Sequence, residues 1–474
     1  MTTTPTAAGS PAKVSTLTLS TFVVGSMVGA GVFSLPGQFA GSAGVGGALL
    51  AWALAGTGTL MLALVFQRLA VQAPHLDAGV FAYAKAGFGD YLGFVSAFGY
   101  WASAVAGNVF YWVFVTTTLG AVFPALGEGD TPAAILVASA GLWLFYALIR
   151  RGVTQAAALN RVVTIAKVAP IVLFVVLCLF VFDPAVFAAN WTGGIDAPPL
   201  WDQVTSTLLV TVFVFIGIEG ASVYSRHARR RRDVGRATLF GFLSVLAVFA
   251  SVTLVSYGVL PRAEIAQLRQ PSMAAILEEA VGPWGSVFVG VALIVAVLGA
   301  YLAWTLMAAE VLLVAARAGV LPRPLRRVDA KDVPVGALTI TTALAQLMLI
   351  VVLFSDNAFD IALDLTSALI LIPYVLSAAF GLKLALTTPG PVRVGAVVVA
   401  ALATAYTAFL LLAAGATYVL LSLIVLVPAT ALFAAAKRER GERVFTPAEW
   451  VVFALAVAGA VTAAALLATG AIGL

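Results

Sequence analysis

Charged side chains are scarce in this sequence. Asp, Glu, Lys and Arg together make up 10% of its 474 residues, whereas hydrophobic residues make up 62%. A typical soluble domain has about 25% charged residues, because water must solvate its surface. The shortage of charge therefore excludes a soluble globular protein and indicates a chain that lies mostly within a membrane.

Residues that bind metals or form disulfides are equally rare. The chain has two histidines and a single cysteine, Cys178, which lies in an apolar run. These numbers exclude a disulfide framework and a Cys/His metal cluster, so we expect no metal and no cofactor. The sequence has neither a Walker-type loop nor a His-Glu pair on one helix, and it therefore predicts no enzyme. Its basic residues occur in short clusters between apolar segments, which argues against a nucleic-acid partner.

Long apolar segments, by contrast, are abundant. Thirteen of them are long enough to span a bilayer, for which a helix needs about 20 residues. We therefore predict an all-α polytopic membrane protein. Only Gly415 and Thr417 separate the eleventh and twelfth segments, so a count of twelve is the alternative. The predicted limits are 15–40, 46–72, 88–123, 131–149, 158–182, 203–225, 237–260, 284–316, 337–355, 358–386, 393–413, 416–436 and 448–470.

The basic residues predict the orientation of these spans. If the N-terminus is cytoplasmic, only Arg262 and Arg269 of the 26 Lys and Arg residues fall in outer loops. Acids such as Glu128 and Asp183 then lie outside. Because membrane proteins keep their basic residues preferentially on the cytoplasmic side, this bias predicts a cytoplasmic N-terminus. Thirteen spans would then place the C-terminus outside.

The first span contains an unusual run of small residues. Residues 25–33 read Gly-Ser-Met-Val-Gly-Ala-Gly-Val-Phe, and Pro36 follows shortly after. Each glycine costs a helix about 1 kcal/mol relative to alanine, so the run predicts an interrupted helix. Backbone N–H groups at such an interruption can bind a carboxylate. The alternative is that the glycines only allow helices to pack closely.

The sixth span has a second candidate interruption. Gly217 and Gly220 flank Glu219 near the middle of the membrane. An ionisable group is costly at that depth and is therefore a functional candidate. The alternative is a structural glutamate that is hydrogen-bonded to nearby backbone or tyrosine. Interruptions in corresponding spans are typical of transporters with inverted repeats, which predicts one repeat over 15–182 and another over 203–386.

With these motifs the chain resembles the amino acid–polyamine–organocation superfamily of transporters, and within it the basic amino acid/polyamine antiporters. The likeness lies in residues 25–36 (GSMVGAGVFSLP), 215–222 (FIGIEGAS) and 298–310 (LGAYLAWTLMAAE), followed by the loop 319–322. It covers the first ten spans and is weak in the last three. The resemblance implies ten core helices in two inverted repeats, with alternating access around a central site.

The resemblance also implies roles for individual residues. Tyr100 and Asn108 match a pattern at the substrate cavity, and Trp304 matches an aromatic residue that stacks on the cationic end of the substrate. Phe213 stands where the arginine/agmatine exchangers have tryptophan, and Ser26 stands where they have asparagine. With these two residues, the chain resembles the arginine/ornithine exchangers more than the arginine/agmatine exchangers. Ordinary packing between helices is the alternative for Tyr100 and Trp304.

The chemistry of a cationic amino acid leads to the same region. Its carboxylate needs donors, which Ser26 and the N–H groups of residues 29–31 can supply. Its ammonium group needs acceptors such as the carbonyls of residues 215–218. Its side chain needs an aromatic face or an acid, for which the buried candidates are Trp304, Phe213, Glu219 and Glu310. The predicted binding residues are Gly25, Ser26, Gly29, Ala30, Gly31, Tyr100, Asn108, Phe213, Phe215, Ile216, Gly217, Glu219 and Trp304.

Two further ionisable residues join Glu219 as candidates for coupling or gating. Lys167 lies inside the fifth span. Its side chain either snorkels to the inner headgroups or, as the resemblance implies, lies where sodium-coupled relatives of the fold bind a cation. Glu310 lies six residues beyond Trp304, which favours pairing within the bundle over contact with the substrate. Nothing in the sequence indicates dependence on sodium.

The sequence thus predicts a secondary active transporter of the plasma membrane, in particular of a bacterial inner membrane. Residues 1–14 form a cytoplasmic tail, 15–390 the transporter core and 393–474 accessory helices. The predicted reaction is the exchange of cationic amino acids, arginine/ornithine or lysine. The alternative is proton-coupled symport of an amino acid or polyamine. The predicted partners are this substrate and the lipid bilayer, and a homodimer is compatible with the sequence.

We expect that replacing the arginines at 229–232 by alanine lowers correct insertion, because these inner charges set the topology. The affinity of the correctly inserted protein for its substrate should stay unchanged. Reporter fusions to successive loops would measure insertion, and binding to purified protein would measure affinity. A large change in affinity together with normal insertion would contradict this role.

Overall fold

The computed structural model describes residues 16–73, 76, 79–151, 157–194, 197–219, 231–331, 333–354, 358–388, 393–413 and 415–469. Within these residues the regular elements are all helices, and ten of them are long and apolar enough to cross a membrane. The prediction of an all-α polytopic membrane protein is therefore confirmed.

The ten long helices coincide with the second to fourth and the seventh to thirteenth predicted segments. They are α3 (Val45–Gln72), α5 (Asp90–Gly120), α6 (Pro132–Arg150), α11 (Arg231–Ser256), α14 (Trp284–Arg317), α15 (Val335–Val352), α16 (Ala358–Thr387), α17 (Val394–Ala413), α18 (Gly415–Arg438) and α19 (Pro447–Ala468). Because α17 and α18 are separate helices, the structure favours thirteen segments over twelve.

The other three predicted segments are the first, the fifth and the sixth. The first span consists of α1 (Thr16–Met27), the 3₁₀ helix η1 (Gly31–Ser34) and α2 (Leu35–Ser42). The fifth is α7 (Ala157–Phe180), and the sixth begins as α9 (Leu200–Phe215). The predicted interruption of the first span is thus confirmed. α9 also stops at the predicted place. Residues 220–230, with Gly220 and two of the four arginines at 229–232, lie outside the described residues.

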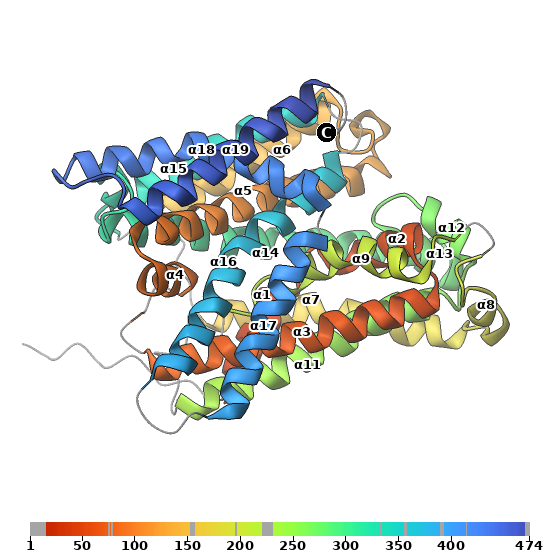
Figure 1. The fold of residues 1–474 in the computed structure, drawn as a ribbon. Coiled ribbons are helices and arrows are strands. Elements are labelled where there is room, and N and C mark those ends of the chain that lie inside the picture. Colours follow the sequence, from red (N-terminus) through yellow and green to blue (C-terminus); the bar gives the residue numbers. More distant parts are fainter. Residues whose placement is uncertain are drawn as a thin grey trace, which may run out of the picture.

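Short helices in the connections were not expected from the sequence. They are α4 (Val80–Phe88), η2 (Pro124–Leu126), α8 (Pro184–Ala189), α12 (Arg262–Gln267), α13 (Ser272–Val281) and η4 (Arg323–Arg326). In Figure 1, α12 and α13 lie at the same end of the molecule as the C-terminal end of α19. That placement agrees with an odd number of spans, since α12 and α13 follow the seventh span.

Helix α5 forms the centre of the structure. Of its most apolar stretch, 94% is buried, and the helix packs against α14, α16, α6 and α15. A second group of helices comprises α1, α3, α9 and α11, which pack against one another. Helix α16 contacts members of both groups (Figure 1). The candidate site therefore lies where the two interrupted spans face α5, α14 and α16.

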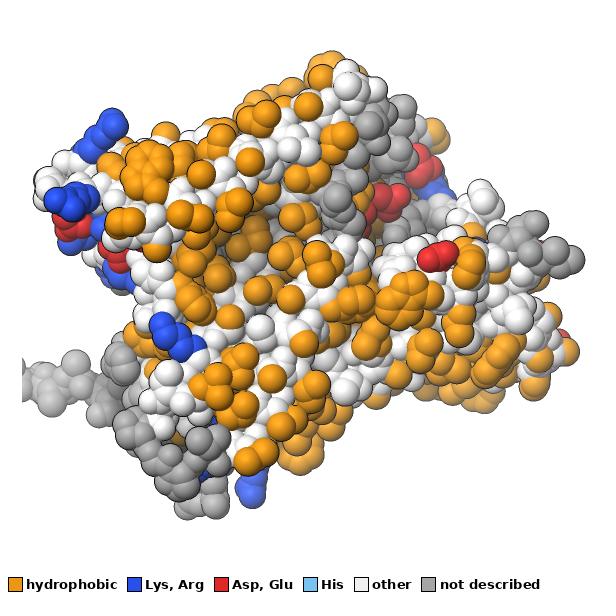
Figure 2. All heavy atoms as spheres, in the orientation of Figure 1, with side chains coloured by type: hydrophobic (Ala, Val, Ile, Leu, Met, Phe, Trp, Pro, Cys, Tyr) orange, Lys and Arg blue, Asp and Glu red, His pale blue; other side chains and the backbone are white. Residues whose placement is uncertain are grey.

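The surface of the helices is apolar. Large hydrophobic side chains such as Leu136, Val287, Leu347 and Leu455 are exposed, as is expected of helices that face lipid tails. Figure 2 shows that, on the face drawn, most Lys and Arg side chains gather at one end of the molecule, and Asp and Glu side chains also lie at the other. The chain is a multi-pass membrane protein.

The end of α18 and the start of α19 are bound to the start of α5. Lys437 Nζ donates to Asp90 Oδ2 at 2.5 Å and to Glu442 Oε2 at 2.8 Å, and the Tyr91 N–H donates to Glu449 Oε1 at 2.8 Å. The hydrogen bond from Lys437 holds the pKa of the Glu442 carboxyl below its ordinary value. These contacts fasten the last two helices to the central helix.

We expect Lys437→Met to lower the melting temperature of the purified protein by roughly 5 °C, because it leaves two carboxylates without their shared cation. Lys437 is buried, whereas the adjacent Arg438 is exposed. Arg438→Met is therefore a matched control that removes the same charge and should leave the melting temperature unchanged. Equal melting temperatures for the two variants would show that the Lys437 contacts do not stabilise the fold.

Candidate functional site

The interruption in the first span leaves backbone donors without acceptors. α1 ends at Met27, and residues 28–30 are not helical. Within the described residues, the N–H groups of Gly29, Ala30 and Gly31 have no hydrogen-bond acceptor. All three residues are buried. Inside a membrane, such irregular backbone is tolerated only where protein surrounds it or where it lines a cavity.

The interruption in the sixth span lies directly against the first. After Phe215, residues 216–219 form a turn. Gly217 has a φ of +106°, and a Cβ at this position would lie 2.7 Å from the carbonyl oxygen of Ser26, so the close approach requires glycine. Ser26 Oγ lies 2.9 Å from Gly217 O and 2.9 Å from Val23 O, and its hydroxyl donates to these carbonyls. The two interruptions are therefore in contact through backbone and side chain.

Glu219 connects this contact to the rest of the structure. Its side chain is 2% exposed and accepts hydrogen bonds from Tyr100 Oη at 2.9 Å, from Tyr374 Oη at 2.7 Å and from the Gly217 N–H at 3.2 Å. Tyr100 belongs to α5 and Tyr374 to α16. The carboxyl group therefore links the interruption in the sixth span to two helices of the central group.

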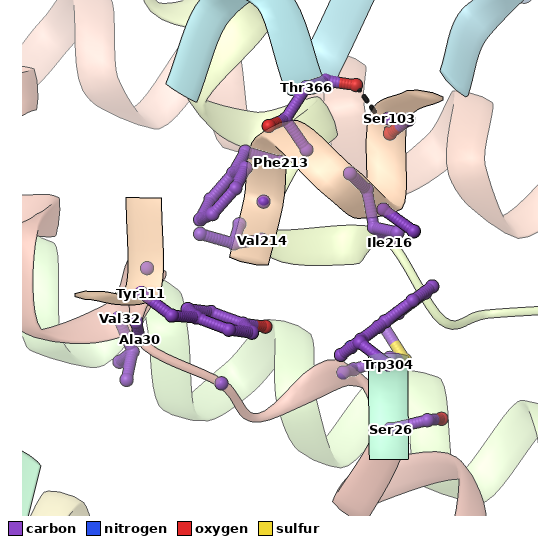
Figure 3. Close-up of a pocket in the computed structure, with 15 residues that line it drawn as sticks. Ser26, Ala30, Val32, Ser103, Tyr111, Phe213, Val214, Ile216, Trp304 and Thr366 are labelled. Carbon is purple, nitrogen blue, oxygen red and sulfur yellow. Dashed lines mark hydrogen bonds between the residues drawn. The ribbon is translucent and has the colours of Figure 1, made fainter. Parts of the chain in front are cut away.

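A small cavity lies beside the two interruptions (Figure 3). Its aromatic walls come from Tyr111 of α5, Phe213 of α9 and Trp304 of α14. Its volume is about 30 Å³, which is room for one or two water molecules. The complete lining consists of Ser26, Met27, Gly29, Ala30, Gly31, Val32, Ser103, Ala104, Gly107, Tyr111, Phe213, Val214, Ile216, Trp304 and Thr366.

Seven of the thirteen predicted binding residues line this cavity, namely Ser26, Gly29, Ala30, Gly31, Phe213, Ile216 and Trp304. The other six are outside its lining, namely Gly25, Tyr100, Asn108, Phe215, Gly217 and Glu219. Gly217 still shapes the site, because its carbonyl oxygen accepts from Ser26 of the first interruption, and Glu219 accepts from the Gly217 N–H.

The remaining predicted residues surround the cavity at different distances. The Tyr100 ring lies 6.1 Å from the Trp304 ring, centroid to centroid. Asn108 Nδ2 donates to Thr305 Oγ1 at 3.1 Å, and Asn108 Oδ1 is buried with no hydrogen-bond partner among the described residues. The Phe215 ring instead packs in the hydrophobic core, where its centroid lies 5.2 Å from that of Phe242.

Sequence reasoning missed several polar residues of the site. Ser103, Tyr111 and Thr366 line the cavity, and Tyr374 binds Glu219. A signal for two of them was present, because Tyr100, Ser103, Gly107 and Tyr111 follow one another at spacings of three or four residues. That spacing places them on one face of a helix. The two residues of α16 have no comparable motif.

The structure separates the two additional ionisable candidates. Lys167 is 3% exposed, and its helix α7 packs against α1, α11 and α14, so its side chain lies within the protein. The expectation that Glu310 is buried is wrong, since this side chain is exposed on α14. Six residues correspond to about 240° of rotation around a helix, which turns Glu310 away from the face of Trp304.

Comparisons with known proteins give a consistent set of relatives. Residues 14–417 match the family described as amino acid permease. The chain is 47% identical over 459 residues to the arginine/ornithine antiporter of Pseudomonas aeruginosa, covering 94% of this chain and 95% of that protein. It is 37% identical over 476 residues to the L-lysine transport protein of Corynebacterium glutamicum, covering 95% of each. It is 35% identical over 472 residues to the arginine/agmatine antiporter of Chlamydia pneumoniae, covering 97% of each.

Proposed function

Because the chain belongs to the amino acid permease family, we propose that it is a secondary active transporter that exchanges cationic amino acids by alternating access. Arginine and ornithine are the proposed pair, and lysine is a further candidate substrate. The observation that carries the proposal is the 47% identity to an arginine/ornithine antiporter over 94% of this chain. Both the family and these relatives are transporters, so no catalytic step is proposed.

The cavity offers groups for both ends of such a substrate. The N–H groups of residues 29–31 are donors for a carboxylate. The faces of Trp304 and Phe213 suit a guanidinium or ammonium group, and a cation over an aromatic ring is worth about 0.5–2 kcal/mol depending on desolvation. Phe213 carries no polar group on its ring, so this wall suits different cationic side chains.

The size of the cavity supports alternating access. At about 30 Å³ it is too small for an amino acid, so the helices around it must move apart before a substrate can bind. The interrupted spans are suited to this movement, because neither is a continuous helix at this level. The hydrogen bond between Ser26 and Gly217 joins them there. We infer that the structure corresponds to a contracted state of the site.

The coupling of substrate to movement is assigned to Glu219. Its hydrogen bonds with Tyr100 and Tyr374 join the sixth span to α5 and α16. A shift of the sixth span relative to these helices would break at least one of these bonds. A substrate that favours one arrangement over the other would therefore shift the balance between the two states.

Proton-coupled symport of an amino acid or polyamine is the second candidate function. The observation that favours it is the burial of two ionisable side chains, Glu219 and Lys167, which are 2% and 3% exposed. Either group could gain or lose a proton during the cycle. Uptake that continues without internal amino acid but stops with an uncoupler would support symport over exchange.

We further propose a cytoplasmic N-terminus in the plasma membrane, in particular a bacterial inner membrane. The concentration of basic side chains at one end of the molecule supports this orientation (Figure 2). Residues 15–390 are proposed as the transporter core, with inverted repeats over 15–182 and 203–386. Residues 393–474 are then accessory helices, and residues 1–14 a cytoplasmic tail. The apolar outer face of α19 is compatible with lipid or with a homodimer.

Exchange in proteoliposomes tests the proposed function. Vesicles loaded with ornithine, arginine, lysine, a neutral amino acid or buffer would be compared for uptake of labelled arginine. Exchange predicts uptake that depends on an internal cationic amino acid and proceeds equally in sodium and choline buffers. Loss of most activity in choline would contradict independence from sodium, and uptake that ignores the internal solute would contradict exchange.

Glu219→Gln should slow exchange at saturating substrate with only a modest loss of binding. The amide keeps the shape of the side chain but cannot accept from the same set of donors, so the linkage to the two tyrosines changes. Exposed Glu310 provides the matched control, and Glu310→Gln should exchange like the parent. If Glu219→Gln exchanges at the parent rate at every pH, the carboxyl group has no role in the conformational step.

Trp304→Leu should weaken the binding of arginine more than it slows exchange at saturation. The expected loss is about 0.5–2 kcal/mol, because the substitution keeps an apolar wall but removes the aromatic face. Calorimetric titration of the purified protein measures the binding term, and exchange in liposomes measures the rate. Unchanged affinity for arginine would exclude the proposed stacking of the cation on this ring.

A further inference from the structure

The hydroxyl groups that line the cavity differ in whether their proton is available. Ser103 Oγ donates to Thr366 O at 2.7 Å, and Thr366 Oγ1 donates to Ala362 O at 2.6 Å. Ser26 Oγ donates to carbonyls on both sides of the contact between the interrupted spans. These three oxygens therefore keep lone pairs for the cavity but no free proton. They can accept hydrogen bonds from a cationic group, whereas a carboxylate needs donors.

Tyr111 is the exception among the hydroxyl groups of this lining. Its side chain is 8% exposed, and within the described residues its hydroxyl makes no hydrogen bond. Figure 3 shows the ring extending from α5 with the hydroxyl pointing into the cavity. Because the hydroxyl lines the cavity and has no acceptor among the residues that the structure describes, its proton is available to a ligand.

The place of this hydroxyl identifies the part of the ligand that it faces. A Cβ at Gly29 would lie 2.9 Å from Tyr111 Oη, so the hydroxyl lies directly against the interruption of the first span. The N–H groups of residues 29–31 are without acceptors at the same place. Phenolic and backbone donors therefore converge on one end of the cavity, which suits an anionic group.

We propose that the Tyr111 hydroxyl donates a hydrogen bond to the α-carboxylate of the substrate and thereby distinguishes amino acids from amines that lack this group. The proposal rests on the function proposed above, since it assigns one contact within that site. The lone pairs of Ser103 and Thr366 face the substrate as acceptors, so the polar groups of the cavity are divided into a donor end and an acceptor end. An amino acid would bind with its carboxylate at the first span.

This division explains a choice between substrates that differ by one group. Agmatine is arginine without its carboxylate, and the chain has relatives named for arginine/ornithine and for arginine/agmatine exchange. When a ligand without a carboxylate displaces water from these donors, the donors lose their hydrogen bonds to water and gain none. The affinity for amines is therefore lowered, and more so the more donors are left unpaired. Removing the Tyr111 hydroxyl removes one of these donors and no other group.

Tyr111→Phe tests the proposal, because it deletes the hydroxyl and keeps the ring. Labelled arginine bound to the purified protein would be displaced by arginine, by argininamide, in which a neutral amide replaces the carboxylate, and by agmatine. We expect arginine to lose roughly tenfold in affinity, because hydrogen bonds to charged groups are the stronger ones. The affinity for agmatine should stay equal or rise, because in the parent the hydroxyl has no acceptor on this ligand. Argininamide, whose carbonyl oxygen still accepts a hydrogen bond, should lose less affinity than arginine. Retained agmatine binding in the same preparation shows that the variant is folded.

Tyr406→Phe is the matched control. Tyr406 is also a buried tyrosine, but its hydroxyl lies 3.4 Å from Thr59 Oγ1 in the contact between α17 and α3, away from the cavity. This variant should bind all three ligands like the parent. If Tyr111→Phe lowers the affinity for the three ligands equally, or leaves that for arginine unchanged, the assignment of the carboxylate to Tyr111 is overturned. A parent protein that binds no cationic amino acid overturns the proposed function itself.

Discussion

Backbone N–H and C=O groups inside a membrane need hydrogen-bond partners, and the structure depends on the two places where the helical hydrogen bonds are interrupted. A continuous helix satisfies every internal N–H and C=O group, which is why most of the chain forms long helices. The first span departs from this at residues 28–30 and the sixth at residues 216–219. Ser26 of the first interruption donates a hydrogen bond to Gly217 O in the second, and a small cavity lies beside both. The N–H groups of residues 29–31 have no acceptor among the described residues, and in the proposed function the carboxylate of the substrate is that acceptor.

Glycine makes this arrangement possible at one position above all. Gly217 has a backbone conformation that other residues rarely adopt, and it lies against the carbonyl group of Ser26. The two interruptions can therefore approach more closely than side chains would permit. Glu219, two residues later, carries the connection outward to Tyr100 and Tyr374. The contact between the two interruptions and the helices α5 and α16 are thus linked through a few adjacent residues.

Helix α5 contacts Glu219, the cavity and the C-terminal helix α18. Its Tyr100 donates a hydrogen bond to Glu219, and its Ser103 and Tyr111 line the cavity. Its first residue, Asp90, accepts from Lys437 of α18. Because this helix is almost wholly buried, its position is determined by contacts along its entire length. Under the proposed alternating access, this helix would be the surface against which the interrupted spans move.

The sequence by itself determined the class of the protein, the positions of its spans and the place of both interruptions. These properties depend on local composition, because a run of apolar residues predicts a span and clustered glycines predict a break wherever they occur. Seven of the thirteen predicted binding residues reached the cavity for the same reason, since most of them belong to these two motifs. The burial of Glu219 also followed from its position in an apolar span.

Only the tertiary structure decided which side chains from other helices complete the site. Thr366 and Tyr374 come from α16, more than 140 residues beyond Glu219, and no local pattern relates them to it. The outward turn of Glu310 depends on the rotation of α14 against its neighbours, which hydropathy does not reveal. The availability of the Tyr111 proton depends on where every nearby acceptor lies in space. Sequence determines such properties only through the fold, because hydrogen bonds between helices depend on distances across the bundle.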